Sequence, residues 1–446
     1  MIKLSQLAKM LHIPWEGADG EIGGFSTDSR TIQPNDFFIA LKGAQFDGHD
    51  YLMQVAAQGA RAAMVSEATV SALPLLKVAD TAQGLMELAS AWRRQFDPVI
   101  AAITGSCGKT STRALLQGIF TACGKTLASE RSFNNNIGVP LTLLRMRTEH
   151  QYAVIEIGAN HPGEIFPLVQ VIQPKVALIT NAGPSHLEGF GSIEGVARAK
   201  SDIYKTLQMS DTAVINQDDA FAPFWKGVIT EARVLTFGIN HKADVMATNL
   251  CFRSTGEPLF TLMTHQGEIE IQLKIMGKHN VYNALAAAAA AVALNISLEK
   301  IQAGLQSVDA EKRRLVSQMG LQQATIIDDS YNANPASVKA AIEVLTQRKG
   351  LRVLVLGDML ELGALSPALH REIGAVAKMA GIEYLFAYGP LSRYSVEAFG
   401  QNGRHFESQQ ALVAELRPLL NQKMTVLVKG SNSMGMNHVA QSLLQE

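Results

Sequence analysis

A glycine-rich loop is the clearest chemical feature of the sequence. The stretch TGSCGKTS, residues 104–111, ends an apolar run and begins a helical stretch. Backbone N–H groups in such a turn, together with the dipole of the following helix, attract an anion. The amine of Lys109 would neutralise terminal phosphate charge, and the hydroxyl of Thr110 would bind magnesium. A strict Walker A loop needs glycine where Ile103 stands, so a purely structural turn is the alternative interpretation.

Three further polar side chains are expected near the ends of neighbouring strands. Glu156 lies in VIEIGANHPGE, His186 in NAGPSHLEGFGS and Lys200 in GVARAKSDI. A carboxylate and an imidazole are suitable partners for a magnesium ion beside a nucleotide. Taken singly, a histidine after a strand is usually an ordinary loop residue, and a lysine in a helix usually faces solvent. The phosphate loop is what favours the metal hypothesis.

A third polar group combines RRL at residues 313–315 with DDSYNANP at residues 328–335. An arginine beside the phosphates could stabilise charge that develops during phosphoryl transfer. The side chains of Asp329, Tyr331 and Asn332 could hold a ribose, a base or the polyphosphate. The alternative is an ordinary turn built on Asp and Asn side chains and ended by proline.

A repeat of apolar strand, turn and helix positions these groups. The first series begins near residue 99, and its strands are expected at VIAAIT, YAVIEIG, VALITN, TAVIN and RVLTFG. Nearly continuous apolar strands that alternate with helices indicate a parallel sheet covered on both faces. Ligands of such sheets bind beyond the carboxyl ends of the strands, where the polar motifs lie.

A second strand and helix series begins near residue 324, with strands expected at ATIIDD, RVLVLG, YLFAYG and TVLVKG. The break between the two series falls near residues 308–315. The first 80 residues form a mixed segment in which NDFFIAL is expected to be a strand. The sequence therefore predicts an α/β protein of three domains: a small mixed domain at 1–80, a central parallel-sheet domain at 81–312 and a third domain at 313–446.

Composition excludes several classes of protein. The 446 residues are 47% hydrophobic, enough for about three globular cores. A formal net charge of -1 provides no basic field for nucleic acid or an anionic membrane surface. Three scattered cysteines do not form a disulfide framework, and the most apolar run, residues 284–294, is too short to span a bilayer. With no signal peptide evident, we expect a cytoplasmic protein without a membrane span.

Eight motifs occur in a fixed order: TGSCGKTST, EIGANHPGEI, NAGPSHLEGFGS, ARAKSDIYK, GKHNVYNALAAAAA, DDSYNANP, VLGDMLELG and LVKGSNS. This set resembles the Mur ligase family of cell-wall synthesis, whose loop carries its first glycine where Gly105 stands. The resemblance covers about residues 25–435. Several motifs, with SFNNNIGVPLTLL, are most similar to those of the members that join D-alanyl-D-alanine to UDP-N-acetylmuramoyl-tripeptide.

The resemblance implies an N-terminal domain that binds the UDP-sugar, a central P-loop-type ATPase and a C-terminal Rossmann-like domain. The implied UDP-sugar contacts are Thr27, Asp28, Ser29, Arg30, Asn134 and Asn135. The implied ATP contacts are Gly105, Ser106, Cys107, Gly108, Lys109, Thr110, Ser111, Asn283, Arg314, Asp329, Tyr331 and Asn332. Because ATP would touch the second and third domains, closure of the third domain is expected to complete the site.

The implied reaction is an ATP-dependent amide ligation through an acyl phosphate. The implied catalytic residues are Lys109, Glu156, His186, Lys200 and Arg314. Magnesium would be held by Thr110, Glu156, His186 and Lys200, the last matching a family lysine that is carbamylated by carbon dioxide. A crowded, desolvated lysine has a lowered pKa, so its neutral amine can react. We expect a monomer.

Three alternatives stay open at this point. Another Mur-type ligase would add a single amino acid, but the DNPR signature expected of enzymes that add the third residue is missing. A ligase similar to folylpolyglutamate synthase would not need the STDSR and FDGHDY segments of the N-terminal part. A nucleotide-dependent switch without ligase chemistry would bind ATP but show no turnover that depends on an acceptor.

Overall fold

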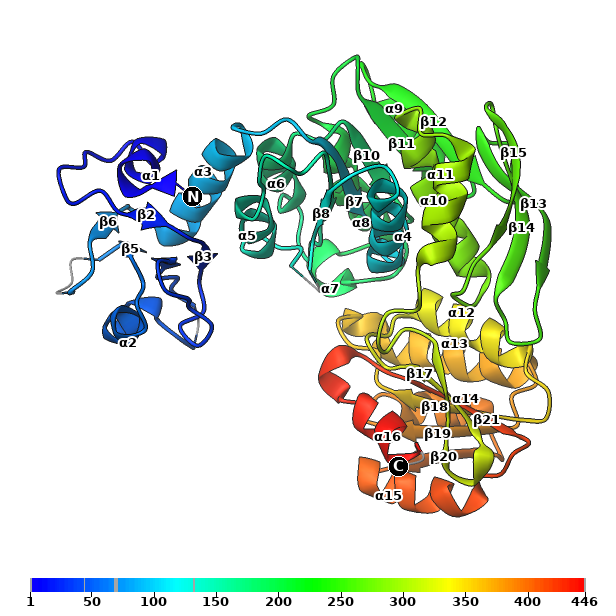
Figure 1. The fold of residues 1–446 in the computed structure, drawn as a ribbon. Coiled ribbons are helices and arrows are strands. Elements are labelled where there is room, and N and C mark those ends of the chain that lie inside the picture. The colour runs from blue at the N-terminus through cyan, green and yellow to red at the C-terminus, as the bar shows by residue number, and fades with distance from the viewer. Residues whose placement is uncertain (1, 44, 68–70, 131–132, 445–446) are drawn as a thin grey trace.

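Three main sheets, each with its own helices, and a separate two-stranded pair make up the described chain (Figure 1). The computed structural model describes residues 2–43, 45–67, 71–130 and 133–444. Figure 1 shows the N-terminal part standing apart from the other two, with helix α3 (Thr81–Arg93) between them, while the third part packs against the central one. The predicted α/β architecture of three parts is confirmed, and the exact boundaries at residues 80 and 312 stay predictions.

The N-terminal part holds a parallel sheet of four short strands in the order β3-β4-β5-β6. Its strands are β3 (Phe25–Ser26), β4 (Phe37–Ile39), β5 (Ala62–Val65) and β6 (Leu75–Lys77). A separate antiparallel pair and three helical segments complete it: β1 (Ile2–Lys3), β2 (Glu21–Ile22), α1 (Leu4–Met10), η1 (Gly48–Tyr51) and α2 (Leu52–Ala57). The strand predicted in NDFFIAL is β4, whose three residues are all buried.

The central sheet has nine strands in the order β15-β14-β13-β12-β11-β10-β7-β9-β8. The five predicted strands are β7 (Val99–Thr104), β9 (Tyr152–Glu156), β10 (Val176–Ile179), β11 (Thr212–Asn216) and β12 (Arg233–Gly238). Together with β8 (Thr126–Ala128) they form a parallel sheet. The prediction of a purely parallel sheet is incomplete, because β13 (Val245–Phe252), β14 (Pro258–Thr264) and β15 (Gly267–Gln272) extend it as an antiparallel meander.

Side chains of β7 show how both faces of this sheet are covered. Ile100 and Ala102 pack into one buried cluster, and Ala101 and Ile103 into the other. The first cluster includes helices α3, α5 (Gly138–Leu144), α6 (Ile165–Ile172) and α8 (Ile193–Ser201). The second includes α4 (Lys109–Thr121), α10 (Lys278–Ala293) and α11 (Leu298–Ser307). Strands covered on both faces are apolar at every position, which is why their sequences are continuous apolar runs.

The alanine-rich stretch forms the buried helix α10, as predicted. Alanine side chains let helix α10 approach α4 and the sheet closely. No helix among the described residues is long and apolar enough to cross a membrane.

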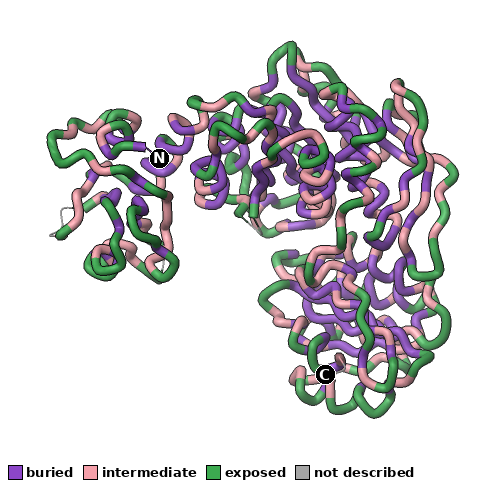
Figure 2. Tube along the Cα trace, viewed as in Figure 1, coloured by how far each residue is buried: buried purple, intermediate pink, exposed green. Residues whose placement is uncertain are grey.

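The third part is a six-stranded sheet in the order β16-β17-β21-β18-β19-β20. The four predicted strands are β17 (Thr325–Asp329), β18 (Leu351–Gly357), β19 (Tyr384–Tyr388) and β21 (Met424–Lys429), all parallel. The edges are antiparallel β16 (Val316–Met319) and parallel β20 (Gly403–Phe406). Helices on both faces are α12 (Pro335–Thr346), α13 (Ser366–Met379), α14 (Arg393–Phe399), α15 (Gln409–Leu416) and α16 (Asn437–Ser442). Buried residues concentrate in the sheets and their facing helices (Figure 2).

Candidate active site

A cavity of about 630 Å³ lies where the central and third parts meet. The loop between β7 and α4, the start of α10 and the turn between β17 and α12 all line it. It brings together most of the residues predicted from sequence: Ser106, Cys107, Gly108, Lys109, Thr110, Ser111, Asn134, Asn135, Glu156, His186, Asn283, Arg314, Asp329, Tyr331 and Asn332. The segments that supply them are spread over more than 200 residues of the sequence.

The glycine-rich loop has a conformation and surroundings that require glycine. Gly108, the residue before helix α4, has a φ of 84°, and Gly105 has a φ of 153°. A Cβ atom at Gly105 would lie 1.8 Å from Thr180 Oγ1, and one at Gly108 would lie 2.2 Å from Asn283 Oδ1. The N–H of Cys107 donates to Asn181 Oδ1 at 2.9 Å, which fixes the loop further. The backbone is therefore held in a conformation suited to binding an anion.

Replacement of Gly108 by alanine is expected to weaken nucleotide binding at least about tenfold. A non-glycine residue at positive φ costs about 1–2 kcal/mol, and the new Cβ must also displace the Asn283 side chain. Gly381→Ala is the matched control, because its φ of 73° imposes similar strain while its nearest contact is 3.7 Å away. Calorimetric titration with an ATP analogue checks this, and equal affinities for the two variants would contradict it.

Lys109, Thr110 and Glu156 form the polar centre of the cavity. Lys109 Nζ donates to the carbonyl of Gly105 at 2.7 Å, and burial lowers the pKa of its amine. The Thr110 hydroxyl lies 3.4 Å from Glu156 Oε1 and accepts from Arg314 Nη2 at 3.0 Å. Arg314 comes from the third part, so the loop and that part are in direct contact.

Glu156 also fits a hard cation. Its side chain is 2% exposed, and its Oε2 atom has no hydrogen-bond partner among the described residues. The Oε1 atom accepts from Asn134 Nδ2 at 2.9 Å, while Arg113 Nε lies 3.7 Å from Oε2. A buried carboxylate oxygen beside a threonine hydroxyl is what magnesium uses, together with substrate phosphates. Within the described ranges, no three His, Cys, Asp or Glu side chains gather as a ready-made metal cage.

The surroundings of His186 and Lys200 differ from those that the neighbouring residues in the sequence predict. His186 precedes the short helix α7 (Leu187–Phe190) with a φ of 52°, and its Nδ1 lies 2.6 Å from the carboxylate of Glu361. Burial lowers the pKa of this imidazole. Lys200 is not at a strand end but within helix α8, and at 1% exposure it does not face solvent. Local sequence could not predict this, because packing of the helix against the sheet decides which side chain is buried.

Burial of Lys200 has a chemical consequence. Desolvation, aided by the positive charge of Lys109, lowers the pKa of the Lys200 amine to about 7. In the part of the chain that is described, no carboxylate lies within ion-pair distance of Nζ, which stands 5.8 Å from the centre of the Phe190 ring. A large fraction of this amine is therefore neutral near pH 7. Lys200 is not among the residues that line the cavity directly.

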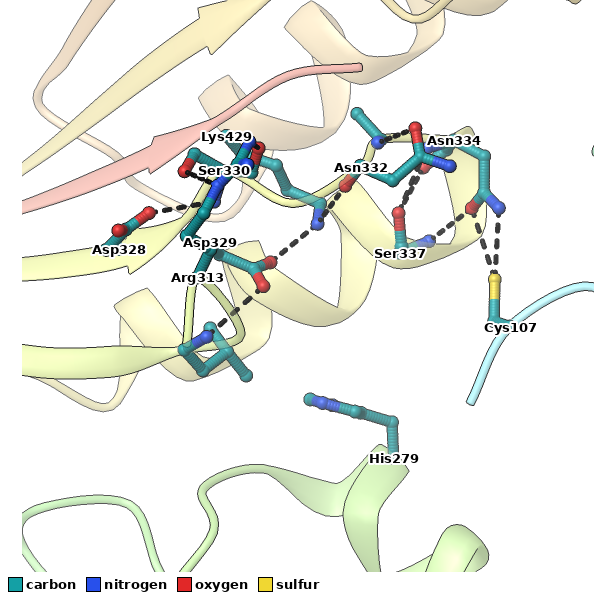
Figure 3. Close-up of polar contacts among 12 residues, drawn as sticks. Cys107, His279, Arg313, Asp328, Asp329, Ser330, Asn332, Asn334, Ser337 and Lys429 are labelled. Carbon is teal, nitrogen blue, oxygen red and sulfur yellow. Dashed lines mark hydrogen bonds and ion pairs between the residues drawn. The ribbon is translucent and has the colours of Figure 1, made fainter. Parts of the chain in front are cut away.

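The third part contributes a buried ionic cluster to the cavity (Figure 3). Lys429 Nζ lies 2.6 Å from Asp329 Oδ2 and donates to the carbonyl of Asn332 at 2.9 Å. The guanidinium of Arg314 lies 4.2 Å from the centre of the Tyr331 ring. Figure 3 also shows Cys107 of the loop facing Asn334, with the thiol 3.3 Å from Oδ1. Both parts are thus linked around the same cavity.

Sequence reasoning missed several residues of this site. Lys429 lies in the motif LVKGSNS and His279 in GKHNVYNAL, but neither residue was predicted to have a role. His279 is partly buried and lines the cavity, desolvation lowers its pKa to about 4, and its Nδ1 has no hydrogen-bond partner within the described chain. Asn280 Oδ1 accepts from Asn283 Nδ2 at 2.8 Å. Polar residues at the end of a strand or at the start of a buried helix were the available signal.

The predicted uridine turn lies away from this cavity. Thr27, Asp28, Ser29 and Arg30 follow β3 in the N-terminal part and do not line it. Arg30 Nε and Nη2 donate to Asp28 at 2.9 and 2.7 Å, which lowers the pKa of that carboxyl to about 2. Asn135 is at the cavity, but its Oδ1 accepts from the N–H of Gly138 at 2.9 Å at the start of α5.

Comparison with known proteins is consistent along the whole chain. Three family models match: the Mur ligase family catalytic domain at residues 21–102, the Mur ligase middle domain at 103–291 and the Mur ligase glutamate ligase domain at 313–432. The UDP-N-acetylmuramoyl-tripeptide–D-alanyl-D-alanine ligase of Escherichia coli K12 is 42% identical, with 99% of this chain and 98% of the relative covered.

Two further comparisons agree. The ligase of the same name from Haemophilus influenzae is 41% identical, with 99% of each chain covered. A crystal structure of MurF from Acinetobacter baumannii superposes with a TM-score of 0.93 at 35% identity, covering 99% of this chain and 98% of the other. Since the models match all three parts and the relatives align nearly end to end, the chain belongs to the Mur ligase family.

Proposed function

We propose that this protein joins D-alanyl-D-alanine to UDP-N-acetylmuramoyl-tripeptide at the expense of ATP, giving UDP-N-acetylmuramoyl-pentapeptide for peptidoglycan synthesis. The names of the relatives that align along the full chain support the substrates. The structural observation that carries the proposal is the contact of Arg314 with Thr110, because it places an arginine of the third part at the phosphate loop. An ATP-dependent ligase needs such a site, closed around the reacting phosphate.

In the first step, the terminal carboxylate of the tripeptide attacks the γ-phosphorus of ATP, and ADP leaves. The product is an acyl phosphate, which supplies the leaving group that a free carboxylate lacks. Lys109 and Arg314 carry positive charge at the loop and stabilise the negative charge that moves onto the leaving ADP. Backbone N–H groups from Gly105 to Ser111 orient the phosphates.

In the second step, the amine of D-alanyl-D-alanine attacks the acyl carbon. The tetrahedral intermediate collapses, the amide bond forms, and inorganic phosphate leaves while the amine loses a proton. The same positive side chains would stabilise the tetrahedral oxyanion.

The magnesium site is proposed at Thr110, Glu156, His186 and carbamylated Lys200. When bound, magnesium would supply positive charge that offsets the phosphate charge. The Oε2 atom of Glu156, which has no hydrogen-bond partner among the described residues, and the partly neutral amine of Lys200 support this assignment. Carbamylation forms an N–C bond between the neutral amine and carbon dioxide and releases a proton, which leaves a buried anion in place of the neutral amine.

The remaining assignments follow the same division of labour. Residues 1–80 would bind the UDP-sugar through Thr27, Asp28, Ser29 and Arg30, with Asn134 and Asn135 nearer the reaction. Residues 81–312 and 313–446 would bind ATP between them, with Asn283 at the adenine and Asp329, Tyr331 and Asn332 on the opposite wall. We propose a monomer that works in the cytoplasm, where ATP and nucleotide-activated precursors are made.

The proposal is tested by ADP release with magnesium, ATP and UDP-N-acetylmuramoyl-tripeptide. Turnover should require D-alanyl-D-alanine and should yield the pentapeptide, identified by its mass. Parallel reactions receive L-alanine, D-glutamate or diaminopimelate in place of the dipeptide. Turnover with a single amino acid would favour another Mur-type ligase, and ATP binding without turnover for any acceptor would favour a nucleotide-dependent switch.

A further inference from the structure

The motif VLGDMLELG, residues 355–363, has no part in the reaction described so far. It leaves β18 at Gly357, and its first polar residue, Asp358, is almost completely buried. Asp358 Oδ1 accepts from the N–H groups of Leu391 and Ser392 at 3.1 and 2.7 Å. Its carbonyl accepts from the N–H of Ser431 at 3.0 Å. The loop therefore begins at a fixed position.

The next two residues are held as firmly. The N–H of Met359 donates to Nε2 of the buried His370 at 3.0 Å, and His370 Nδ1 donates to the carbonyl of Ser366 at 2.7 Å. The N–H of Leu360 donates to Ser431 Oγ at 2.9 Å. Three consecutive residues are thus anchored to the body of the third part. Such anchoring of a loop is the usual support for a side chain that must be placed accurately.

Glu361 is the residue that this loop presents. Its Oε2 atom lies 2.6 Å from Nδ1 of His186 in the central part. The N–H of Glu188 lies 3.5 Å from the carbonyl of Glu361, so the two segments also approach each other through the backbone. Both partners are strained, because Glu361 has a φ of 63° and His186 a φ of 52°. Strained non-glycine residues of this kind are kept where surrounding structure fixes them, and they concentrate at functional sites.

We infer that Glu361 is a positioning residue for His186, which it holds in the tautomer that carries its hydrogen on Nδ1. The carboxylate accepts that hydrogen, so the lone pair of Nε2 is left for the cavity that His186 lines. Histidines that bind metals are commonly oriented in this way by a carboxylate on the other ring nitrogen. Because Glu361 belongs to the third part, docking of that part would prepare His186 for magnesium.

The inference deepens the proposed function and rests on it for the role of magnesium. The tautomer of His186 does not depend on ligase activity. The inference and the proposed function can therefore fail separately. Glu361→Gln keeps a carbonyl oxygen that accepts the Nδ1 hydrogen, whereas Glu361→Ala removes the acceptor. Glu372→Ala is the matched control, because Glu372 is also an exposed, ion-paired glutamate of the third part, bound to Lys339.

The first measurement is the tautomer of His186 in the full chain labelled with ¹⁵N-histidine, saturated with an ATP analogue and free of metal. A spectrum of His186→Gln identifies the signal among the 11 histidines. Wild type, Glu361→Gln and Glu372→Ala should show the hydrogen on Nδ1, and Glu361→Ala should shift it towards Nε2. Hydrogen on Nε2 in wild type, or no change in Glu361→Ala, would overturn the inference.

The second measurement is the affinity for Mn²⁺, read by electron paramagnetic resonance in the presence of the same analogue. Loss of an orienting carboxylate typically weakens metal binding about 10–100-fold. Glu361→Ala should fall in that range, while Glu361→Gln and Glu372→Ala should stay within about threefold of wild type. Unchanged Mn²⁺ affinity in Glu361→Ala would overturn the link to the metal, and equal melting temperatures for the variants would exclude misfolding as the cause of a loss.

Discussion

Replacement of Lys200 by alanine is expected to reduce ligase turnover about a thousandfold or more. Lys200 is buried without a carboxylate partner within the described residues, and its pKa of about 7 makes the neutral amine available to carbon dioxide. The carbamate would place an anion beside the proposed magnesium site, and loss of such a group costs several kcal/mol of transition-state stabilisation. Steady-state ADP release with both substrates measures the loss.

Controls separate the carbamate from general damage. Lys205→Ala removes an exposed lysine that follows the same helix, and it should keep near-normal turnover. Bicarbonate should restore wild-type activity lost in buffer stripped of carbon dioxide, but it should not rescue Lys200→Ala. A ¹³C carbamate signal from labelled bicarbonate should appear in wild type and not in Lys200→Ala. Near-normal turnover of Lys200→Ala would remove the residue from the mechanism.

The pH dependence of the carbamate signal has a definite sign. With a pKa of about 7, about a tenth of the Lys200 amine is neutral at pH 6 and about nine tenths at pH 8. Only the neutral amine reacts, so the signal should strengthen as the pH rises across this interval. An unburied lysine, with its ordinary pKa near 10.4, would stay almost fully protonated throughout.

Most of the strands that could be predicted are those whose surroundings make nearly every residue apolar. Strands β7, β9, β10 and β11 are buried along nearly their whole length, so each is a continuous apolar run. The meander β13 to β15 was not predicted, because one face is exposed and the alternation of apolar and polar residues is interrupted by a register shift between Thr248 and Cys251. Edge strands such as β8 have only three residues, which is too short for a periodic signal.

The candidate site was predictable where one local segment must do the chemistry. A phosphate loop needs glycines at set positions, and Gly105 and Gly108 have the positive φ values that explain them. Residue pairs that are far apart in the sequence and meet only in the folded protein have no such local sequence pattern. Lys429 lies 100 residues from Asp329, its partner in a buried ion pair, and Cys107 lies 227 residues from Asn334. Only packing of the two parts decides which of many polar residues meet.

These long-range pairs share one arrangement. Arg314 reaches Thr110, Glu311 forms an ion pair with Arg113, and Glu361 meets His186. Each joins the third part, or the segment that leads into it, to a residue beside the phosphate loop. Docking of the third part therefore forms contacts at several points of the cavity at once. ATP bound between the parts would be expected to favour the docked state.

Lys109→Ala is expected to lower kcat/KM for ATP about a thousandfold, equivalent to about 4 kcal/mol. Burial lowers the pKa of the Lys109 amine, and among the described residues this amine donates one hydrogen bond, to the carbonyl of Gly105. It is therefore available to phosphate oxygens. Since charge on those oxygens shifts during transfer, kcat should fall more than KM rises.

Lys109→Arg should not restore activity, because a planar guanidinium cannot occupy the compact position of an ammonium group. Lys125→Ala, which removes an exposed lysine paired with Glu149, is the control for loss of charge on the same part. Stopped-flow measurement of ADP formation separates the chemical step from binding. If Lys109→Ala lost less than about tenfold in that step, the loop would be a nucleotide-binding turn whose lysine does not act on the transferred phosphoryl group.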